Sequence, residues 1–304
     1  MTALGQLRVE LSRLKDIDRV LVAAVVPLMV IGVLSIYSAL AGKGGVAMDM
    51  ALKQSAWCAL GAAAFAASFA FGHERALKYG YWIYGGVLLS LVAVLVAGYT
   101  AKGATSWFDF GAFRFQPSEP AKLSLSVVLA VFLCRYPPKT LVNISGAILL
   151  SSLVVVPVLL QPDLGGVVVY AFMIFVALVL AGMPRKYILL LAGVALLSLP
   201  LGWSMLKEYQ KLRMLVFLNP SIDPLGAGYN VIQSRLAVGA GGSFGKGFLQ
   251  GTQSRLHFLP EAHTDFVFSV FSEEFGFAGA SLVLALFAIL LWRMLSTSAR
   301  SGDP

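Results

Sequence analysis

Apolar residues occur along the chain in long runs that short polar stretches separate. Runs long enough to cross ~30 Å of hydrocarbon as a helix occupy residues 20–40, 54–72, 79–98, 119–134, 142–160, 164–182, 187–205 and 267–292. The fourth run is the least apolar, because Glu119 and Lys122 lie in its first turn and Arg135 ends it. The pattern predicts an all-α polytopic membrane protein with about eight transmembrane helices.

The basic residues predict how these helices are oriented. Lysine and arginine occur before the first run, after the last run and in every second connection, as at Arg75 with Lys78 and at Arg185 with Lys186. Positively charged loops stay on the cytoplasmic side of a membrane. We therefore expect a multi-pass membrane protein with both termini in the cytoplasm.

One connection is much longer than the others. Residues 206–266 lie between the seventh and eighth spans, and the alternation of basic connections places them outside the cytoplasm. The stretches 214–218 and 229–238 are apolar, so we expect this extracytoplasmic loop to fold against the helices. We expect residues 1–304 to form a single membrane domain that contains the loop.

Composition and charge exclude several classes of protein. Hydrophobic residues make up 58% of the chain and charged residues 12%, values outside the range of soluble domains. The net charge of +8 comes from short basic clusters between apolar runs, a pattern that disfavours nucleic-acid binding. Cys58 and Cys134 lie inside apolar runs, which disfavours a disulfide or a zinc site.

Asp265 is the first candidate for chemistry. It lies in the segment His263-Thr264-Asp265-Phe266, at the boundary between the long loop and the last span. An ionisable group is costly to place in hydrocarbon, so at such a boundary it marks a functional site by default. Position alone leaves a second interpretation open, in which Asp265 is a helix N-cap or a first-turn acid that complements the helix dipole.

Other charged residues share the predicted extracytoplasmic face. Glu119 and Lys122 are three positions apart, so they can pair on one face of a helix. Asp163 follows Pro162 and precedes a helical run, as an N-cap does. Taken alone, the ion pair and the N-cap are sufficient structural explanations for these residues. Together with Asp265, however, these side chains also suit a polar site at one membrane face.

The long loop and Trp107 add candidates for substrate binding. The loop supplies Gln233, Lys246, Glu261 and His263. Its glycine-rich run 239–247 lacks the Gly-Lys-Ser/Thr ending of a nucleotide P-loop. Two interpretations of this run stay open: a flexible loop, or a backbone nest that holds a pyrophosphate. Trp107 is either an aromatic-belt anchor or a flat surface for a sugar ring or lipid head group.

Three stretches resemble motifs of one known family. They are residues 102–122 (KGATSWFDFGAFRFQPSEPAK), residues 161–165 (QPDLG) and residues 217–279, which run from FLNPSIDPLGAGYNVIQSRLAVGAGGSFGKG to EAHTDFVFSVFSEEFGFAG. These stretches resemble the SEDS family, which includes RodA, FtsW and SpoVE. The resemblance covers nearly the whole chain. The segments KGATSWFDFG and GTQSRLHFLPE resemble the RodA branch, which serves cell elongation and rod shape, more closely than the FtsW branch of cell division.

The resemblance implies an enzyme, a peptidoglycan glycosyltransferase that polymerises lipid II into glycan strands for the cell wall. The 4-hydroxyl of an acceptor GlcNAc attacks C1 of the MurNAc at the reducing end of the lipid-linked chain and expels undecaprenyl pyrophosphate. Asp265 matches the acid that the family requires, and we interpret it as the general base. We expect substrate-binding residues at Trp107, Glu119, Lys122, Asp163, Gln233, Lys246, Glu261 and His263.

The resemblance also implies a location in the bacterial inner membrane, partners and a cofactor. We expect a class B penicillin-binding protein and other membrane proteins of the elongation machinery as partners, and no nucleic acid. A divalent cation, Mg²⁺ or Mn²⁺, would help Lys122 and Lys246 to stabilise the departing pyrophosphate. No metal ligand is assigned, and no nucleotide is expected.

Two departures from the family pattern keep alternatives open. Ser106 stands where the family commonly has an arginine before the tryptophan. Family members also usually have ten spans, so we expect the last two spans of the bundle to be absent from this chain. A lipid II flippase or other transporter is one alternative to the enzyme. An inactive, truncated scaffold of the elongation machinery is the other.

Overall fold

The structure is a computed structural model that describes residues 17–101, 104–111, 113–256 and 258–300. Its described residues form two compact units. The first unit contains the chain up to Ala70 and the chain from Gly202 onward, and the second unit contains Phe71–Leu201.

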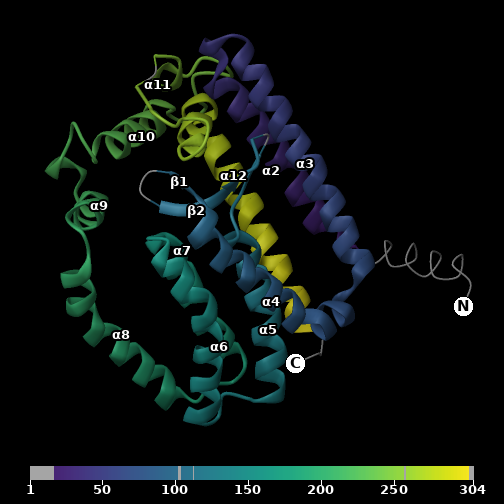
Figure 1. The fold of residues 1–304 in the computed structure, drawn as a ribbon. Coiled ribbons are helices and arrows are strands. Elements are labelled where there is room, and N and C mark those ends of the chain that lie inside the picture. Colours follow the sequence, from purple (N-terminus) through teal and green to yellow (C-terminus); the bar gives the residue numbers. More distant parts are fainter. Residues whose placement is uncertain (1–16, 102–103, 112, 257, 301–304) are drawn as a thin grey trace, which may run out of the picture. The chain divides into compact units, whose positions relative to one another are not determined.

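Helices from both ends of the chain build the first unit. They are α2 (Arg19–Ala39), η2 (Ala41–Lys43), α3 (Gly45–Phe71), α9 (Glu208–Leu218), η3 (Pro220–Ile222), α10 (Tyr229–Ala240), α11 (Thr252–Arg255) and α12 (Val267–Arg300). The longest, α12, packs along α2 and against α10, and Figure 1 shows α2 and α12 side by side. Chain segments more than 200 positions apart therefore share one helix pair.

Polar contacts tie α2 to α12 at two levels. Asp18 caps α2 by accepting hydrogen bonds from the amides of Val20 and Leu21, as short acids at an N-cap do. Its other oxygen accepts a hydrogen bond from Arg293 Nε at 2.7 Å. Near the other end of α2, the Ser38 hydroxyl donates to Glu274 of α12. These contacts set the register of two apolar helices whose side chains alone would permit sliding.

Helix α12 is not continuous. Gly276 has φ 65° and ψ −162°, a conformation that only glycine adopts without strain. The helix therefore consists of two segments on either side of Gly276. Ser269, Val270, Phe271, Ser272, Glu273 and Glu274 of the first segment are buried.

Five helices form the second unit: α4 (His73–Ala97), α5 (Ser118–Arg135), α6 (Leu141–Leu160), α7 (Leu164–Leu180) and α8 (Arg185–Met205). Helix α5 packs against α4, α6 and α7, and Leu125, Val128 and Leu129 of α5 are almost completely buried. Tyrosine hydroxyls cross-link the unit, since Tyr84 donates to the carbonyl of Leu150 and Tyr170 to that of Ser118.

A small sheet lies between α4 and α5 along the chain. The sequence analysis did not predict this sheet. Strands β1 (Tyr99–Ala101), β2 (Ala104–Asp109) and β3 (Arg114–Phe115) pair antiparallel in the order β1-β2-β3. The all-α prediction is therefore wrong for this connection. The reason is that β1 and β3 have only three and two residues, while the six residues of β2, Ala-Thr-Ser-Trp-Phe-Asp, do not alternate between apolar and polar as a period-two signal requires.

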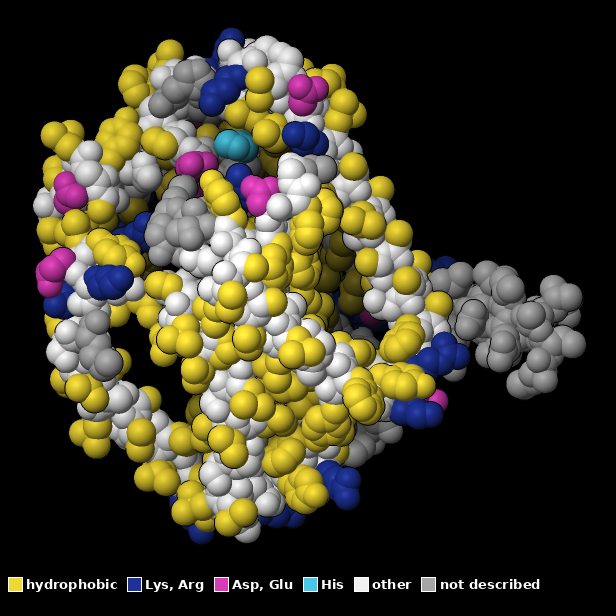
Figure 2. All heavy atoms as spheres, in the orientation of Figure 1, with side chains coloured by type: hydrophobic (Ala, Val, Ile, Leu, Met, Phe, Trp, Pro, Cys, Tyr) yellow, Lys and Arg dark blue, Asp and Glu magenta, His cyan; other side chains and the backbone are white. Residues whose placement is uncertain are grey.

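The predicted class, a helical polytopic membrane protein, is confirmed. Each of the eight predicted spans coincides with a helix, and six described helices are long and apolar enough to cross a membrane. Of the remaining two, α7 has 17 residues and α5 carries Glu119, Lys122 and Arg135, so the number of spans stays a prediction. On the face drawn in Figure 2, hydrophobic side chains predominate along the helices.

The long segment 206–266 contains helices of its own. Its two predicted apolar stretches lie in α9 and α10, and α10 packs on α12 through the buried Ala237 and a 2.7 Å hydrogen bond between the hydroxyls of Ser234 and Ser269. For α10 the expectation that the loop folds against the helices is therefore confirmed.

Candidate active site

Asp265 lies on a tight turn that leads into α12. The carbonyl of Glu261 accepts hydrogen bonds from the amides of Thr264, Asp265 and Phe266, at 3.1, 3.1 and 3.4 Å. Glu261 itself has φ 52°, a conformation that costs free energy for a residue with a side chain. The turn therefore places three consecutive amides around one carbonyl, and these hydrogen bonds fix the backbone on either side of Asp265.

The carboxylate of Asp265 is exposed, and no hydrogen bond or ion pair joins it to another described residue. Helix α12 begins at Val267, so Asp265 is not the residue directly before the helix. Its side chain accepts no hydrogen bond from the described amides of the first turn, which argues against the N-cap interpretation. An exposed carboxylate of this kind is available to a substrate hydroxyl.

A cavity of about 390 Å³ lies beside this turn. Residues Leu259, Pro260, Glu261, Ala262 and His263 line one side, and Ala39, Leu40 and Lys43 from the end of α2 and from η2 line the other. The cavity brings together Glu261 and His263, both predicted, with Lys43, which the sequence analysis missed. The signal for Lys43 was a basic residue in the short predicted extracytoplasmic connection after the first span.

Gln233 and Lys246 belong to the same unit as Asp265. Gln233 is half-buried on α10. Lys246 follows α10 in the glycine-rich loop, and its ammonium lies 2.7 Å from Glu273 Oε1 and 2.8 Å from Thr252 Oγ1. The charge of Lys246 is thus paired within the protein.

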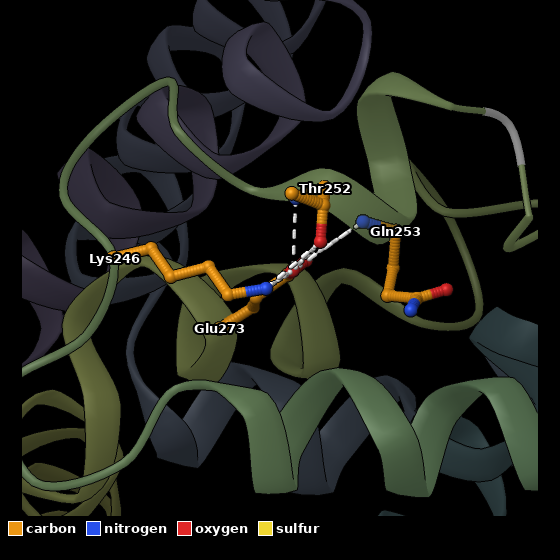
Figure 3. Close-up of polar contacts among 4 residues, drawn as sticks. All are labelled: Lys246, Thr252, Gln253 and Glu273. Carbon is orange, nitrogen blue, oxygen red and sulfur yellow. Dashed lines mark hydrogen bonds and ion pairs between the residues drawn. The ribbon is translucent and has the colours of Figure 1, made fainter.

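Glu273 is the most connected acid among the described residues, and the sequence analysis did not select it. Its carboxylate, 0% exposed, accepts hydrogen bonds from Lys246 Nζ, from the amide and hydroxyl of Thr252 and from the amide of Gln253. Figure 3 shows Lys246 reaching Glu273 from the loop, with Thr252 and Gln253 converging from α11. Adjacent acids within an apolar run, Glu273 and Glu274, were the available signal.

The predicted polar residues of the second unit gather at one end of its helices. Lys122 Nζ lies 2.7 Å from Glu119 Oε1 in the first turn of α5, so the predicted pair is confirmed. Asp163 accepts a hydrogen bond from the amide of Gly166 at 2.9 Å, so the predicted N-cap of α7 is confirmed. Tyr170 of α7 donates to the carbonyl of Ser118 beside Glu119, which joins these two helix starts.

Trp107 lies in β2 and is half-buried, opposite Tyr99 of β1. An ion pair at 3.1 Å between Asp109 and Arg114 closes the next turn of the sheet. The amide of Gly111 and the guanidinium of Arg114 hold the pKa of Asp109 below its usual range. Lys102, Gly103, Ala112 and His257, which belong to the motifs quoted above, lie outside the described residues.

The described residues include no group of three or more His, Cys, Asp or Glu side chains arranged to hold a metal ion. The expected divalent cation therefore has no ligand set among them. It stays a prediction, and we assign no step to it.

Comparison with known proteins decides the family. The FtsW/RodA/SpoVE family model, described as "Cell cycle protein", matches residues 18–304. The chain belongs to the FtsW/RodA/SpoVE family. Among its relatives in this family, the peptidoglycan glycosyltransferase MrdB of Escherichia coli strain K12 is 42% identical over 216 residues, which cover 70% of this chain and 58% of MrdB. The chain thus matches less than two thirds of that relative's length.

Other FtsW/RodA/SpoVE relatives match over more of their length. A probable peptidoglycan glycosyltransferase FtsW of Geobacter metallireducens is 33% identical, with 98% of this chain and 81% of the relative covered. The crystal structure of Thermus thermophilus RodA has a TM-score of 0.66 at 31% identity and covers 94% of this chain and 76% of that one.

A chain from a peptidoglycan synthase complex gives a TM-score of 0.78 at 37% identity, with 94% of this chain and 79% of that chain covered. That structure is described as showing the coordination of polymerization and crosslinking. Membership of the FtsW/RodA/SpoVE family confirms the family that the sequence motifs indicated.

Proposed function

We propose that the chain is a peptidoglycan glycosyltransferase that polymerises lipid II into glycan strands during cell elongation. The observation that carries the proposal is the exposed Asp265 carboxylate, which has no hydrogen-bond or ion-pair partner among the described residues, on a turn bordered by a polar cavity. Its relatives MrdB of Escherichia coli and RodA of Treponema pallidum are named peptidoglycan glycosyltransferases, and FtsW of Geobacter metallireducens is named a probable one.

In the proposed reaction, Asp265 takes the proton of the acceptor 4-hydroxyl as its oxygen forms a bond to C1 of the donor sugar. The bond between C1 and the pyrophosphate oxygen breaks, and the electron pair leaves with undecaprenyl pyrophosphate. A general base must reach the proton that it removes, and an exposed side chain that no other described residue engages meets this requirement.

The remaining predicted residues are assigned to substrate binding. Glu261 and His263 border the cavity beside Asp265, where a hydroxyl or amide of a sugar can be hydrogen-bonded. Lys122, which is half-exposed, supplies positive charge for the pyrophosphate. Trp107 supplies a ring face for a sugar or lipid head group. Glu119, Asp163, Gln233 and Lys246 are assigned to the polar surroundings of the substrate.

Purified Asp265→Ala and Asp265→Asn proteins, incubated with lipid II, a divalent cation and no ATP, test this proposal. We expect glycan strands from the wild type and a loss of at least about 100-fold in both variants, the range that loss of a general base gives. Wild-type turnover by either variant would remove Asp265 from the reaction. Lipid II that crosses a vesicle membrane unpolymerised would indicate a transporter. If the protein neither forms glycan strands nor moves lipid II across the membrane, the result would indicate a scaffold.

The proposal includes a partner and a topology. We propose a class B penicillin-binding protein as partner, supported by the similarity to a chain from a complex that couples polymerization to crosslinking. Co-purification and a rise in polymerisation rate on adding that protein test the partner. We also propose eight spans, cytoplasmic termini and an extracytoplasmic segment 206–266, which labelling of single cysteines introduced in each connection of a variant without Cys58 and Cys134 tests.

A further inference from the structure

The glycine-rich loop after α10 replaces hydrogen bonds that α12 lacks at its break. In a continuous helix the amides of Phe277 and Ala278 donate to the carbonyls of Glu273 and Glu274, four residues earlier. Here those two amides donate instead to Gly242 and Ser243, at 2.8 and 3.0 Å.

The carbonyls that the break leaves open are also satisfied by the loop. Glu273 accepts from the amide of Lys246 at 3.0 Å and Glu274 from the amide of Gly247 at 2.9 Å. Four backbone groups of the break are therefore paired with four backbone groups of residues 242–247. Unpaired buried backbone groups are costly, so the break in α12 and the loop stabilise each other.

Glycines permit this close approach. A Cβ atom at Gly245 would overlap the carbonyl of Glu274, and one at Gly276 would overlap the amide of Gly245. Both residues also have positive φ, 83° and 65°. The loop and α12 are thus in direct backbone contact, with no side chain between them.

The side chain of Glu273 extends this attachment to α11. Its buried carboxylate lies 2.8 Å from both the amide and the hydroxyl of Thr252 and 3.2 Å from the amide of Gln253, so it caps the start of α11 (Figure 3). Lys246 balances its charge at 2.7 Å. A buried carboxylate without a cation and several donors would be strongly destabilising.

The cap on α11 also anchors the start of the segment that carries Asp265. The described residues 258–266 lead to Val267, six positions before Glu273 on the same helix. The carbonyl of Gln253 accepts from the amides of Phe258 and Leu259, and the buried Leu259 belongs to the same small core as Val270. The segment that carries Asp265 is therefore fixed to α12 at both of its ends.

We propose that Glu273 is a positioning residue for the reaction, which holds α11 and thereby the turn of Asp265 in place. The inference rests on the proposed function, because the reaction is what the turn positions. A misplacement of about 1 Å far from the reacting atoms can lower a rate by 10²-fold. Loss of the cap frees one end of residues 256–266 and leaves Asp265 itself unchanged.

Kinetics of the full chain with lipid II test the proposal on Glu273→Gln, Lys246→Met and the double variant. Glu273→Gln keeps an oxygen for Thr252 and Gln253 but leaves Lys246 unpaired. We expect kcat to fall by about 10- to 100-fold with KM within about twofold, because positioning affects the transition state more than ground-state binding. The double variant, which has no unpaired charge, is expected to recover the protection of residues 258–266 from hydrogen exchange that Glu273→Gln loses, a readout that does not depend on contact between Lys246 and substrate.

Glu208→Gln is the matched control. It breaks an exposed ion pair with Lys211, at 2.8 Å, in the same unit. We expect wild-type kinetics from this variant, since an exposed pair contributes little. Size-exclusion profiles and melting temperatures identify any variant that fails to fold. For that case Thr252→Val, which removes one donor and keeps the ion pair, replaces Glu273→Gln with the same expected direction.

Hydrogen exchange of residues 256–266 separates this inference from the proposed function. We expect exchange there to rise at least about tenfold in Glu273→Gln, with α2 unchanged, because the open state becomes more populated. Wild-type kcat and wild-type exchange in this variant would overturn the inference. If wild-type protein forms no glycan, the proposed function fails. In that case the hydrogen-exchange measurement alone tests the positioning role. Wild-type exchange of residues 256–266 in Glu273→Gln would overturn it.

Discussion

Asp18, at the start of α2, and Arg293, near the end of α12, form an ion pair across 275 positions of sequence, with Nη2 2.6 Å from Oδ2. The pair fixes the ends of two apolar helices relative to each other. Ser38 and Glu274 fix the same helices near the other end of α2. The segment that carries Asp265 ends directly before α12, so the position of α12 matters for the proposed site.

The pH dependence of stability should report the ion pair of Asp18. Desolvation raises the pKa of Asp18, but hydrogen bonds from Arg293 and from the amides of Leu21 and Val20 outweigh it and lower the pKa below its usual value. A lowered folded-state pKa gives stability that is fully present above the unfolded pKa and lost as pH falls through the folded pKa.

We therefore expect Asp18→Asn to melt at a lower temperature than the wild type at neutral pH. The difference should shrink as pH falls below about 4, where aspartate protonates in the unfolded chain. Melting curves of the two proteins in one detergent, taken from pH 7 to pH 3, measure it. A difference that stays constant over this range would contradict the assignment.

Alanine at Gly245 should destabilise the attachment of the loop to α12. The added Cβ overlaps the carbonyl of Glu274, and the positive φ adds strain, so we expect a loss of at least about 1–3 kcal/mol. Gly239, in α10, is the control, because a Cβ there has no neighbour within 4 Å. Gly239→Ala should be neutral or stabilising by up to about 1 kcal/mol. Equal melting temperatures for the two variants would contradict the packing.

Lys122→Met should lower polymerisation without lowering stability. The ion pair with Glu119 is exposed, with 61% of the Glu119 side chain accessible, and such pairs contribute about 0–1 kcal/mol. Loss of a cation from a pyrophosphate site costs about 10- to 1000-fold in rate. Lys211→Met, which breaks a comparable pair with Glu208, should leave both properties unchanged. Equal rates for the two variants would exclude Lys122 from the site.

Gln161→Leu should leave the protein as stable or make it more stable. The Gln161 side chain is 0% exposed, and neither its amide nitrogen nor its amide oxygen has a hydrogen-bond partner among the described residues. A buried amide without partners costs about 1–3 kcal/mol, which a leucine of similar volume avoids. Melting temperatures measure the effect. A drop of several degrees would mean that the amide has a partner beyond the described residues.

The sequence predicted the features that depend on neighbouring positions. The apolar runs gave the helices, because helix length and hydrocarbon thickness are matched locally. The pair of Glu119 with Lys122 followed from their spacing of three residues within one helix turn, and the cap by Asp163 followed from its place after Pro162 and before an apolar helical run. Asp265 was selected from its place at the boundary between the long loop and the start of the last apolar run.

Only the tertiary structure decided how distant segments meet. Glu273 lies inside the last apolar run, and nothing near it in sequence indicates that Lys246, 27 positions earlier, pairs with it. The break at Gly276 likewise has no local signal beyond a glycine. Its backbone groups are satisfied by residues 242–247, and a hydrogen bond between segments leaves no periodic trace in either of them. The sequence alone therefore determined which residues form helices and where charge lies, while the packing of the loop on α12 decided which of those charges are paired.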